Sequence, residues 1–285
     1  MDYMKPQMAV HSSIFSPPDL HALNVEIKGI VWVLRLAHQS QDNALIYTFA
    51  TAFSVDNNGL IMTSAFPFRN KPLPCINARR LDDDAFLYEV KVVRIKSRWN
   101  VALLRVKNVP CCNFGRFAVD SSLFEGQKVL HMGHPGNFVG SLTVGTVVFP
   151  CVDNVHVPLD NQKCENYTCT ALNITPQYRI MGNIWNSGVW VGADLEDYVF
   201  ERQLHPQTPI IQIYGLGFRD GCLGGPVFNI RGEIVGMMSM SHLNFEIAIH
   251  GSLLRQVLSE IEEKKEGGDN KQDKSQAGCS KRRKR

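Results

Sequence analysis

Short runs of β-branched, aromatic and aliphatic residues recur along most of this 285-residue chain. Clusters of Gly, Pro, Asn and Asp separate them, and Asp56-Asn57-Asn58-Gly59 predicts a hairpin turn. Many short strands at this spacing are typical of an all-β barrel or sandwich. The predicted strands are Val25–Leu36, Tyr47–Val55, Leu60–Ser64, Phe86–Ile95, Val101–Val106, Gln127–Met132, Leu142–Phe149, Ile210–Tyr214, Val227–Asn229, Glu233–Ser239 and Phe245–Ile249.

The two ends of the chain differ from this β-like body. Residues 1–22 hold three prolines and no periodic apolar pattern, which predicts a loosely held arm. Apolar residues at helical spacing predict a helix over Ser252–Ile261. Residues 264–285 hold nine Lys or Arg and three acids, so they carry +6 while residues 1–263 sum to −3. This tail has nothing to bury and is predicted to be disordered.

Composition and cysteine usage favour an intracellular protein, in the nucleus or the cytoplasm. The chain has no run of about 18 apolar residues, so no membrane span is expected. Its first residues lack the apolar segment of a secretory signal, so the eight cysteines are expected to be reduced thiols. The pair His131 and His134 has no evident third ligand, and we expect neither a metal nor a cofactor.

Four segments, in order, carry a resemblance to a known family. Gly59–Ala65 is an apolar strand ending in Thr-Ser-Ala, and Trp99–Val106 is a second apolar run. Glu125–Val147 contains Gly-His-Pro and Thr-Val-Gly-Thr-Val, and Gly221–Gly236 contains a Gly-Gly-Pro turn between strands. Together they resemble the trypsin-like serine peptidase domain of the Deg/HtrA (Do-like) group in the PA clan, especially its plant-type members with degenerate triads. The resemblance implies a double β-barrel with a C-terminal helix.

The resemblance also places the three catalytic positions of a serine peptidase. It puts the catalytic histidine at Phe66, the aspartate at Asn100 and the serine at Leu223. A peptidase of this class needs a hydroxyl nucleophile, an imidazole base and a carboxylate that orients the base. Phenylalanine, asparagine and leucine perform none of these roles, so we predict that the triad is lost.

The turn itself leaves two chemical possibilities open. Its amides, in the segment of Gly221, Cys222, Leu223, Gly224 and Gly225, resemble an oxyanion-binding turn. Alternatively the glycines are there because the turn needs positive φ or close strand approach. Cys222 stands one residue before the nucleophile position and is a candidate nucleophile, but no histidine occupies the base position. His131 and His134 are expected at the start of the second barrel, away from that site.

The last five residues are a second functional feature. Lys281, Arg282, Arg283, Lys284 and Arg285 repel one another and are expected to stay extended. They resemble a nuclear-import signal or a non-specific phosphate-binding tail, and a plain solubility tail is the alternative. No aromatic residue lies among them, so specific nucleic-acid recognition is not expected.

These observations predict a flexible arm over 1–22, a peptidase-like domain over 23–263 and the tail over 264–285. The domain would comprise barrels over about 23–120 and 121–263, with a loop or hairpin insertion over about 151–209. The predicted function is that of an inactive protease homologue that binds a peptide or protein through a retained cleft or an exposed strand edge. The alternatives are an active peptidase using Cys222 or a displaced triad, and a nuclear adaptor acting through the tail. Partners and oligomeric state are not predicted.

Overall fold

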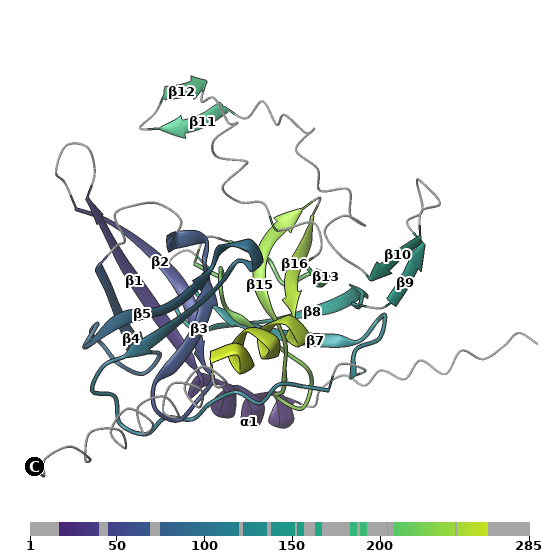
Figure 1. Cartoon of the computed structure of the whole chain (residues 1–285), viewed down its shortest axis with the longest axis horizontal. Helices are drawn as coiled ribbons and strands as arrows, with labels where there is room; N and C mark the ends of the chain where they lie inside the picture. Colours follow the sequence, from purple (N-terminus) through teal and green to yellow (C-terminus); the bar gives the residue numbers. More distant parts are fainter. Residues whose placement is uncertain are drawn as a thin grey trace, which may run out of the picture.

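Two closed six-stranded barrels lie side by side in the computed structural model of the chain (Figure 1). The structure describes residues 17–39, 45–68, 75–119, 122–135, 138–151, 208–219, 221–242 and 244–261, together with Leu204 and four short strands between 153 and 192. A helix over 251–261 follows the last strand. The predicted double barrel with a C-terminal helix is therefore confirmed, whereas the basic tail lies outside the described residues.

The first barrel has the strand order β1-β2-β3-β6-β5-β4. Its strands are β1 (Val31–Gln39), β2 (Leu45–Ser54), β3 (Leu60–Ser64), β4 (Cys75–Arg80), β5 (Tyr88–Lys96) and β6 (Val101–Val106). Short 3-10 turns follow β3 and β5, namely η1 (Phe66–Phe68) and η2 (Ser97–Trp99). Strand β4 was not predicted, because only Ile76 and Ala78 face the core and two arginines end it.

The second barrel has the order β13-β16-β15-β14-β7-β8. Its strands are β7 (Lys128–Gly133), β8 (Ser141–Phe149), β13 (Ile210–Tyr214), β14 (Pro226–Phe228), β15 (Ile234–His242) and β16 (Phe245–His250). Within the span 151–209 the structure describes two separate two-stranded antiparallel sheets. They are β9 (Asp153–His156) with β10 (Lys163–Asn166), and β11 (Asn183–Asn186) with β12 (Val189–Gly192).

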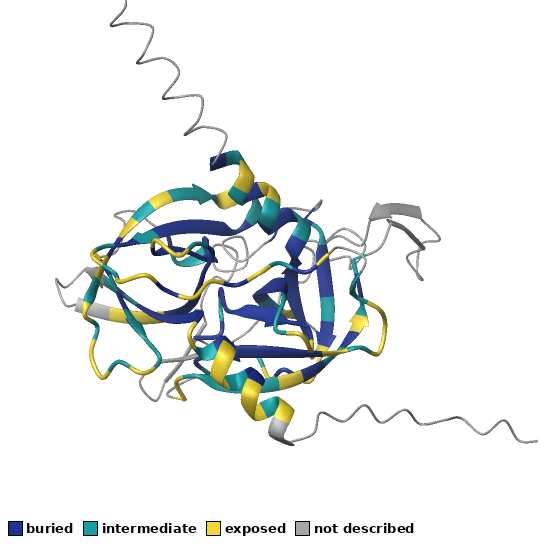
Figure 2. Cartoon of the chain, turned by 90° about the horizontal axis from the view of Figure 1, so that it is seen from below, coloured by how far each residue is buried: buried dark blue, intermediate teal, exposed yellow. Residues whose placement is uncertain are grey.

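Each barrel has its own apolar core, and a third core fills the interface between the barrels. The third core, which we call the interbarrel core, includes Phe53 and Leu103 from the first barrel and Phe228 and Met237 from the second. Leu254 of the C-terminal helix also belongs to it. Figure 2 shows the buried residues mainly on the strands in the middle of the molecule and the exposed residues mainly on the helices, loops and outer strands around them. Residues at the interface therefore pack against side chains of both barrels.

Helix α1 (Pro17–Lys28) corrects the prediction for the start of the chain. It begins inside the expected arm, and it occupies the first part of the expected strand Val25–Leu36. Leu20, Leu23 and Ile27 recur at helical spacing and pack against the interbarrel core. The β-branched Val25 suggested a strand, but it is 60% exposed and lies on the outer side of the helix. None of the helices in the described ranges is long and apolar enough to cross a membrane.

Candidate functional site

The Gly-Gly-Pro turn lies at the interface of the barrels and is bonded to both. On the first barrel, the Thr51 amide donates to the Leu223 carbonyl at 3.0 Å, and Thr51 Oγ1 donates to the Gly221 carbonyl at 2.6 Å. On the second barrel, the Gly224 amide donates to the Met238 carbonyl at 2.9 Å, and the Met238 amide donates back to Gly225 at 2.8 Å. The turn is thus fixed by hydrogen bonds that do not depend on the Leu223 side chain.

Backbone geometry explains the glycines of this turn. Gly221 and Gly224 have φ of 95° and 81°, in the region that favours glycine. A Cβ on Gly221 would lie 2.0 Å from the His134 carbonyl oxygen. A Cβ on Gly224 would lie 2.2 Å from Thr63 Oγ1 and 2.6 Å from the amide nitrogen of Ser64. Close packing therefore requires these residues whether or not the turn has any chemistry.

The amides of the turn fall into two groups. Those of Cys222, Gly224 and Gly225 donate to backbone carbonyls. Those of Gly221 and Leu223 form no hydrogen bond with any residue that the structure describes. Two amides of the segment expected to resemble an oxyanion-binding turn therefore have no acceptor among the described residues.

Asn100 lies where the resemblance places a catalytic carboxylate, and its amide bridges the two barrels. It ends η2 in the left-handed conformation with φ of 54°, which asparagine tolerates better than most residues, and it is buried. Its Oδ1 accepts a hydrogen bond from Ser64 Oγ of the first barrel at 2.9 Å. Its Nδ2 donates to Ser239 Oγ of the second barrel at 2.9 Å. The side chain is engaged at both ends in holding the barrels together.

Phe66 and Leu223 lie beside the same serine. The Phe66 amide donates to Ser64 Oγ at 3.1 Å, and the Ala65 amide donates to the Asn100 carbonyl at 3.1 Å. Leu223 precedes Gly224, on which a Cβ would lie 2.6 Å from the Ser64 amide nitrogen. Phe66 and Leu223 are each partly exposed. The structure thus gathers the three positions, which are far apart in sequence, around Ser64 at the interface of the barrels.

Two buried imidazoles lie against the inner side of the turn. His131 Nδ1 donates to the Pro226 carbonyl at 3.0 Å, and its Cε1 would lie 2.5 Å from a Cβ on Gly225. His134 donates from Nε2 to the Trp32 carbonyl at 3.2 Å. Both histidines follow the expected start of the second barrel, but the expectation that they lie away from the site is wrong. Strand β14, which leaves the turn, pairs with β7 and brings His131 beneath it.

Burial governs the protonation of these histidines. Desolvation lowers the pKa of His131 to about 4, although the hydrogen bond to the Pro226 carbonyl acts in the opposite direction and raises it. Desolvation likewise lowers the pKa of His134 to about 4. Both are neutral near pH 7, and His131 Nε2 has no hydrogen-bond partner in the described structure. A base with a pKa of about 4 activates a thiol or hydroxyl poorly.

Cys222 is near His131 but is shielded from substrate. A Cβ on Gly133 would lie 2.6 Å from His131 Nε2 and 3.3 Å from Cys222 Cα, so the ring and this residue are neighbours. Cys222 is only 2% exposed and forms no disulfide. Sequence reasoning missed the proximity of His131 because the signal is a strand pairing rather than a motif.

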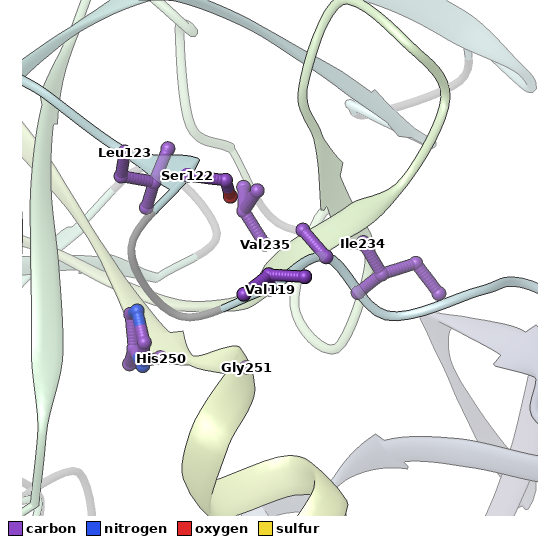
Figure 3. A pocket seen from close by; sticks show the side chains of 8 residues that line it. Val119, Ser122, Leu123, Ile234, Val235, His250 and Gly251 are labelled. Atoms are coloured by element: carbon purple, nitrogen blue, oxygen red, sulfur yellow. The ribbon is translucent and has the colours of Figure 1, made fainter.

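A small pocket lies elsewhere on the second barrel. It is too small for more than about one water molecule, and it is lined by residues that include Val119, Ser122, Ile234 and His250 (Figure 3). None of the sequence-predicted site residues lines it. Among the described residues, no group of three or more His, Cys, Asp or Glu side chains is placed to hold a metal ion. The tail residues 281–285 lie outside the described structure.

Comparison with known families agrees with this geometry. The model of a trypsin-like peptidase domain matches residues 50–237, which include Phe66, Asn100 and Leu223. A comparison with curated proteins finds no matching sequence.

Proposed function

This chain belongs to the family of trypsin-like peptidase domains, and from that premise we propose that it is a catalytically inactive homologue that binds a peptide or protein. Within the family we assign it to the Deg/HtrA group of the PA clan, on the four segments that resemble that group. The observation that carries the proposal is the convergence of Phe66, Asn100 and Leu223 at one place. None of these three positions carries a hydroxyl, an imidazole or a carboxylate.

The size of the expected catalytic loss supports inactivity. Removing the nucleophile of a serine peptidase costs about 10⁶ in kcat, and removing the whole triad costs about the same. In a serine peptidase that lacks its triad, the oxyanion hole and substrate binding still give a residual acceleration of roughly 10³–10⁴ over water. The amides of Gly221 and Leu223 would form the corresponding oxyanion hole here. That acceleration is far below the turnover of a peptidase, but the same amides can still donate hydrogen bonds to a carbonyl or carboxylate oxygen of a bound chain.

An open strand edge next to the turn supports peptide binding. Strand β3 pairs with β2 only at Phe53 and Ser54, although β2 begins at Leu45. The Thr51 amide points toward Leu223 and away from β1. Since alternate residues of an antiparallel strand point the same way, the main-chain groups of Phe49 and Tyr47 also point away from β1. Within the described residues no strand covers this edge, and an extended peptide can add to it.

Two measurements on the full chain test the proposal. Inactivity predicts no cleavage of fluorescein-labelled reduced casein and no labelling by a fluorophosphonate probe. Binding predicts that the same casein raises fluorescence anisotropy, and that Phe49→Pro, which removes an edge amide, weakens binding at least about tenfold. Phe49→Ala keeps the amide and is the matched control. Cleavage by the unmodified chain would refute inactivity, and equal binding by both variants would refute the edge.

The Cys222 alternative rests on the neighbouring His131 and has its own test. If Cys222 were a nucleophile, casein cleavage and labelling by a thiol-directed probe would both disappear in Cys222→Ala. The adaptor alternative rests on Lys281–Arg285. Deletion of 281–285 would then abolish nuclear accumulation of a fluorescent fusion, while casein binding stayed unchanged.

A further inference from the structure

The outer face of the first barrel carries a cluster of aromatic rings and guanidinium groups, which we call the ring–arginine cluster. It comprises Arg35 on β1, Tyr47 and Phe49 on β2, Arg79 on β4 and Phe86 before β5. Arg35 Cζ lies 5.4 Å from the Tyr47 ring centroid and 4.6 Å from that of Phe86. Arg79 Cζ lies 5.5 Å from the Phe86 centroid, and the Phe49 and Phe86 centroids are 6.0 Å apart.

Strand register holds this cluster in place. Arg35 is paired with Phe49 on one side and with Asn77 on the other, and its Nη2 donates to Asn77 Oδ1 at 3.5 Å. Arg79 Nη1 donates to the carbonyl of Asp83 at 2.6 Å. Two guanidinium groups are therefore held between rings and oxygen acceptors, a side-chain amide for Arg35 and a main-chain carbonyl for Arg79, so little side-chain entropy remains to be lost on binding.

The cluster exposes large apolar surface. Tyr47 is 49% exposed and Phe49 is 48% exposed, on neighbouring outward positions of one strand. Aromatic rings next to arginines are the side chains most enriched where proteins bind partners. The contact with Arg35 orients the Tyr47 ring and the contact with Phe86 orients the Phe49 ring, but about half of the Tyr47 and Phe49 surfaces stays in water.

The two arginines also lack anionic partners. In the described part of the chain, neither Arg35 nor Arg79 has a carboxylate within ion-pair distance, and Arg35 Nε is buried without an acceptor. Two other cations of the same barrel are paired, Arg105 with Asp56 at 3.1 Å and Lys107 with Glu89. Held but unpaired guanidinium groups are suited to bidentate contact with carboxylates.

We propose that the ring–arginine cluster is a docking surface for a protein segment that carries carboxylate side chains next to large apolar ones. A protein is favoured over nucleic acid by the surrounding charge. Residues 1–263 sum to −3, and Asp82 and Asp84 are exposed beside the cluster. These charges repel a continuous line of phosphates, whereas a peptide can place one or two carboxylates on Arg35 and Arg79. The proposal does not depend on the loss of the triad.

Fluorescence anisotropy with two labelled 12-residue peptides tests the proposal on the full chain. One peptide alternates Asp with Leu and Phe, and the other has Asn in place of Asp. The Asp peptide is expected to bind at least about tenfold more tightly, and raising the NaCl concentration from 50 to 300 mM should weaken it. Arg35→Gln and Arg79→Gln should each weaken it about tenfold, whereas Lys91→Gln, an exposed cation on β5, should not. Casein binding at the β2 edge should persist in all three variants.

Several outcomes would overturn the proposal. Equal affinity for the two peptides would show that the carboxylates play no role in binding. If Lys91→Gln weakened binding of the Asp peptide as much as the arginine variants do, the effect would be one of net charge and not of this surface. Tighter binding of a 20-nucleotide poly(dT) that is lost in the arginine variants would assign the surface to nucleic acid. Self-association in sedimentation that is lost in those variants would assign it to a second copy of the chain. Thermal unfolding of each variant checks that lost binding is not lost folding.

Discussion

Acidification is expected to destabilise this fold through His131 and His134, well before the carboxylates are protonated. Both are neutral in the folded state, with a pKa of about 4 caused by burial, against 6.5 for an unfolded histidine. The unfolded chain therefore binds protons that the folded chain excludes. The stability contribution of the neutral form is complete above pH 6.5 and is lost as the pH falls toward 4.

The structure sets the size of this effect. At pH 5 an unfolded histidine is about 1.5 pH units below its pKa of 6.5 and is therefore almost fully protonated. The folded histidines, with a pKa of about 4, stay mostly neutral at this pH. Each histidine therefore costs about 2 kcal/mol of unfolding free energy at pH 5, which is about thirtyfold in the unfolding constant. Two such losses are a large part of the 5–15 kcal/mol that is typical of a folded domain.

Urea unfolding at pH 7.5, 6 and 5 measures the effect, and two variants isolate its source. His131→Asn keeps an amide donor for the Pro226 carbonyl, and His134→Gln keeps a donor for the Trp32 carbonyl. Both remove the titrating ring. Each should flatten the fall in stability between pH 7.5 and 5 by about 2 kcal/mol, whatever its stability at pH 7.5. If both variants lose stability with pH as steeply as the unmodified chain, the burial argument fails.

Three further predictions concern residues at or near the turn, and equilibrium unfolding at pH 7.5 checks each of them. Gly224→Ala adds a Cβ 2.2 Å from Thr63 Oγ1 at φ of 81°, and should lower the unfolding free energy by about 3 kcal/mol or more. A loss below about 1 kcal/mol would contradict the tight packing. Asn100→Leu removes both bridging hydrogen bonds and should lower the unfolding free energy by about 2–4 kcal/mol. Asn100→Asp can accept from both serine hydroxyls and should cost less. The reverse order would rule out the bridge. Glu246→Gln keeps an acceptor for the Gly217 amide and removes a buried carboxylate oxygen that has no partner in the described structure. It should therefore leave stability within about 1 kcal/mol, unlike Glu246→Leu.

The sequence predicted the barrels well, because their strands carry compact apolar runs bounded by turn residues. The prediction failed where a residue that is typical of one kind of element lies in another kind. Val25 suggested a strand but lies on the outer side of α1, and Arg79 and Arg80 obscured β4. The failures share a cause: local composition does not reveal which side of an element meets the core.

The site was predictable in its parts but not in its connections. The order of the motifs identified Phe66, Asn100 and Leu223, and the structure gathers them around Ser64. The bridge from Asn100 to Ser239 and the placement of His131 under the turn depend on contacts between strands more than 90 residues apart in the chain. No local pattern encodes such contacts, so sequence reasoning placed both histidines away from the site.

The hydrogen bonds around Ser64 show that the positions of the proposed degenerate triad also hold the two barrels together. Asn100 accepts from Ser64 on one barrel and donates to Ser239 on the other, so the same bonds that hold a carboxylate position in place also join the two barrels. The Thr51 bonds to Gly221 and Leu223 do the same for the nucleophile position. Substitutions at Phe66 or Leu223 that change only the side chain leave these bonds intact, whereas substitutions that move the turn break the contact between barrels. Stability alone therefore preserves the positions of the site, and the identity of the side chains there is the part that function must account for.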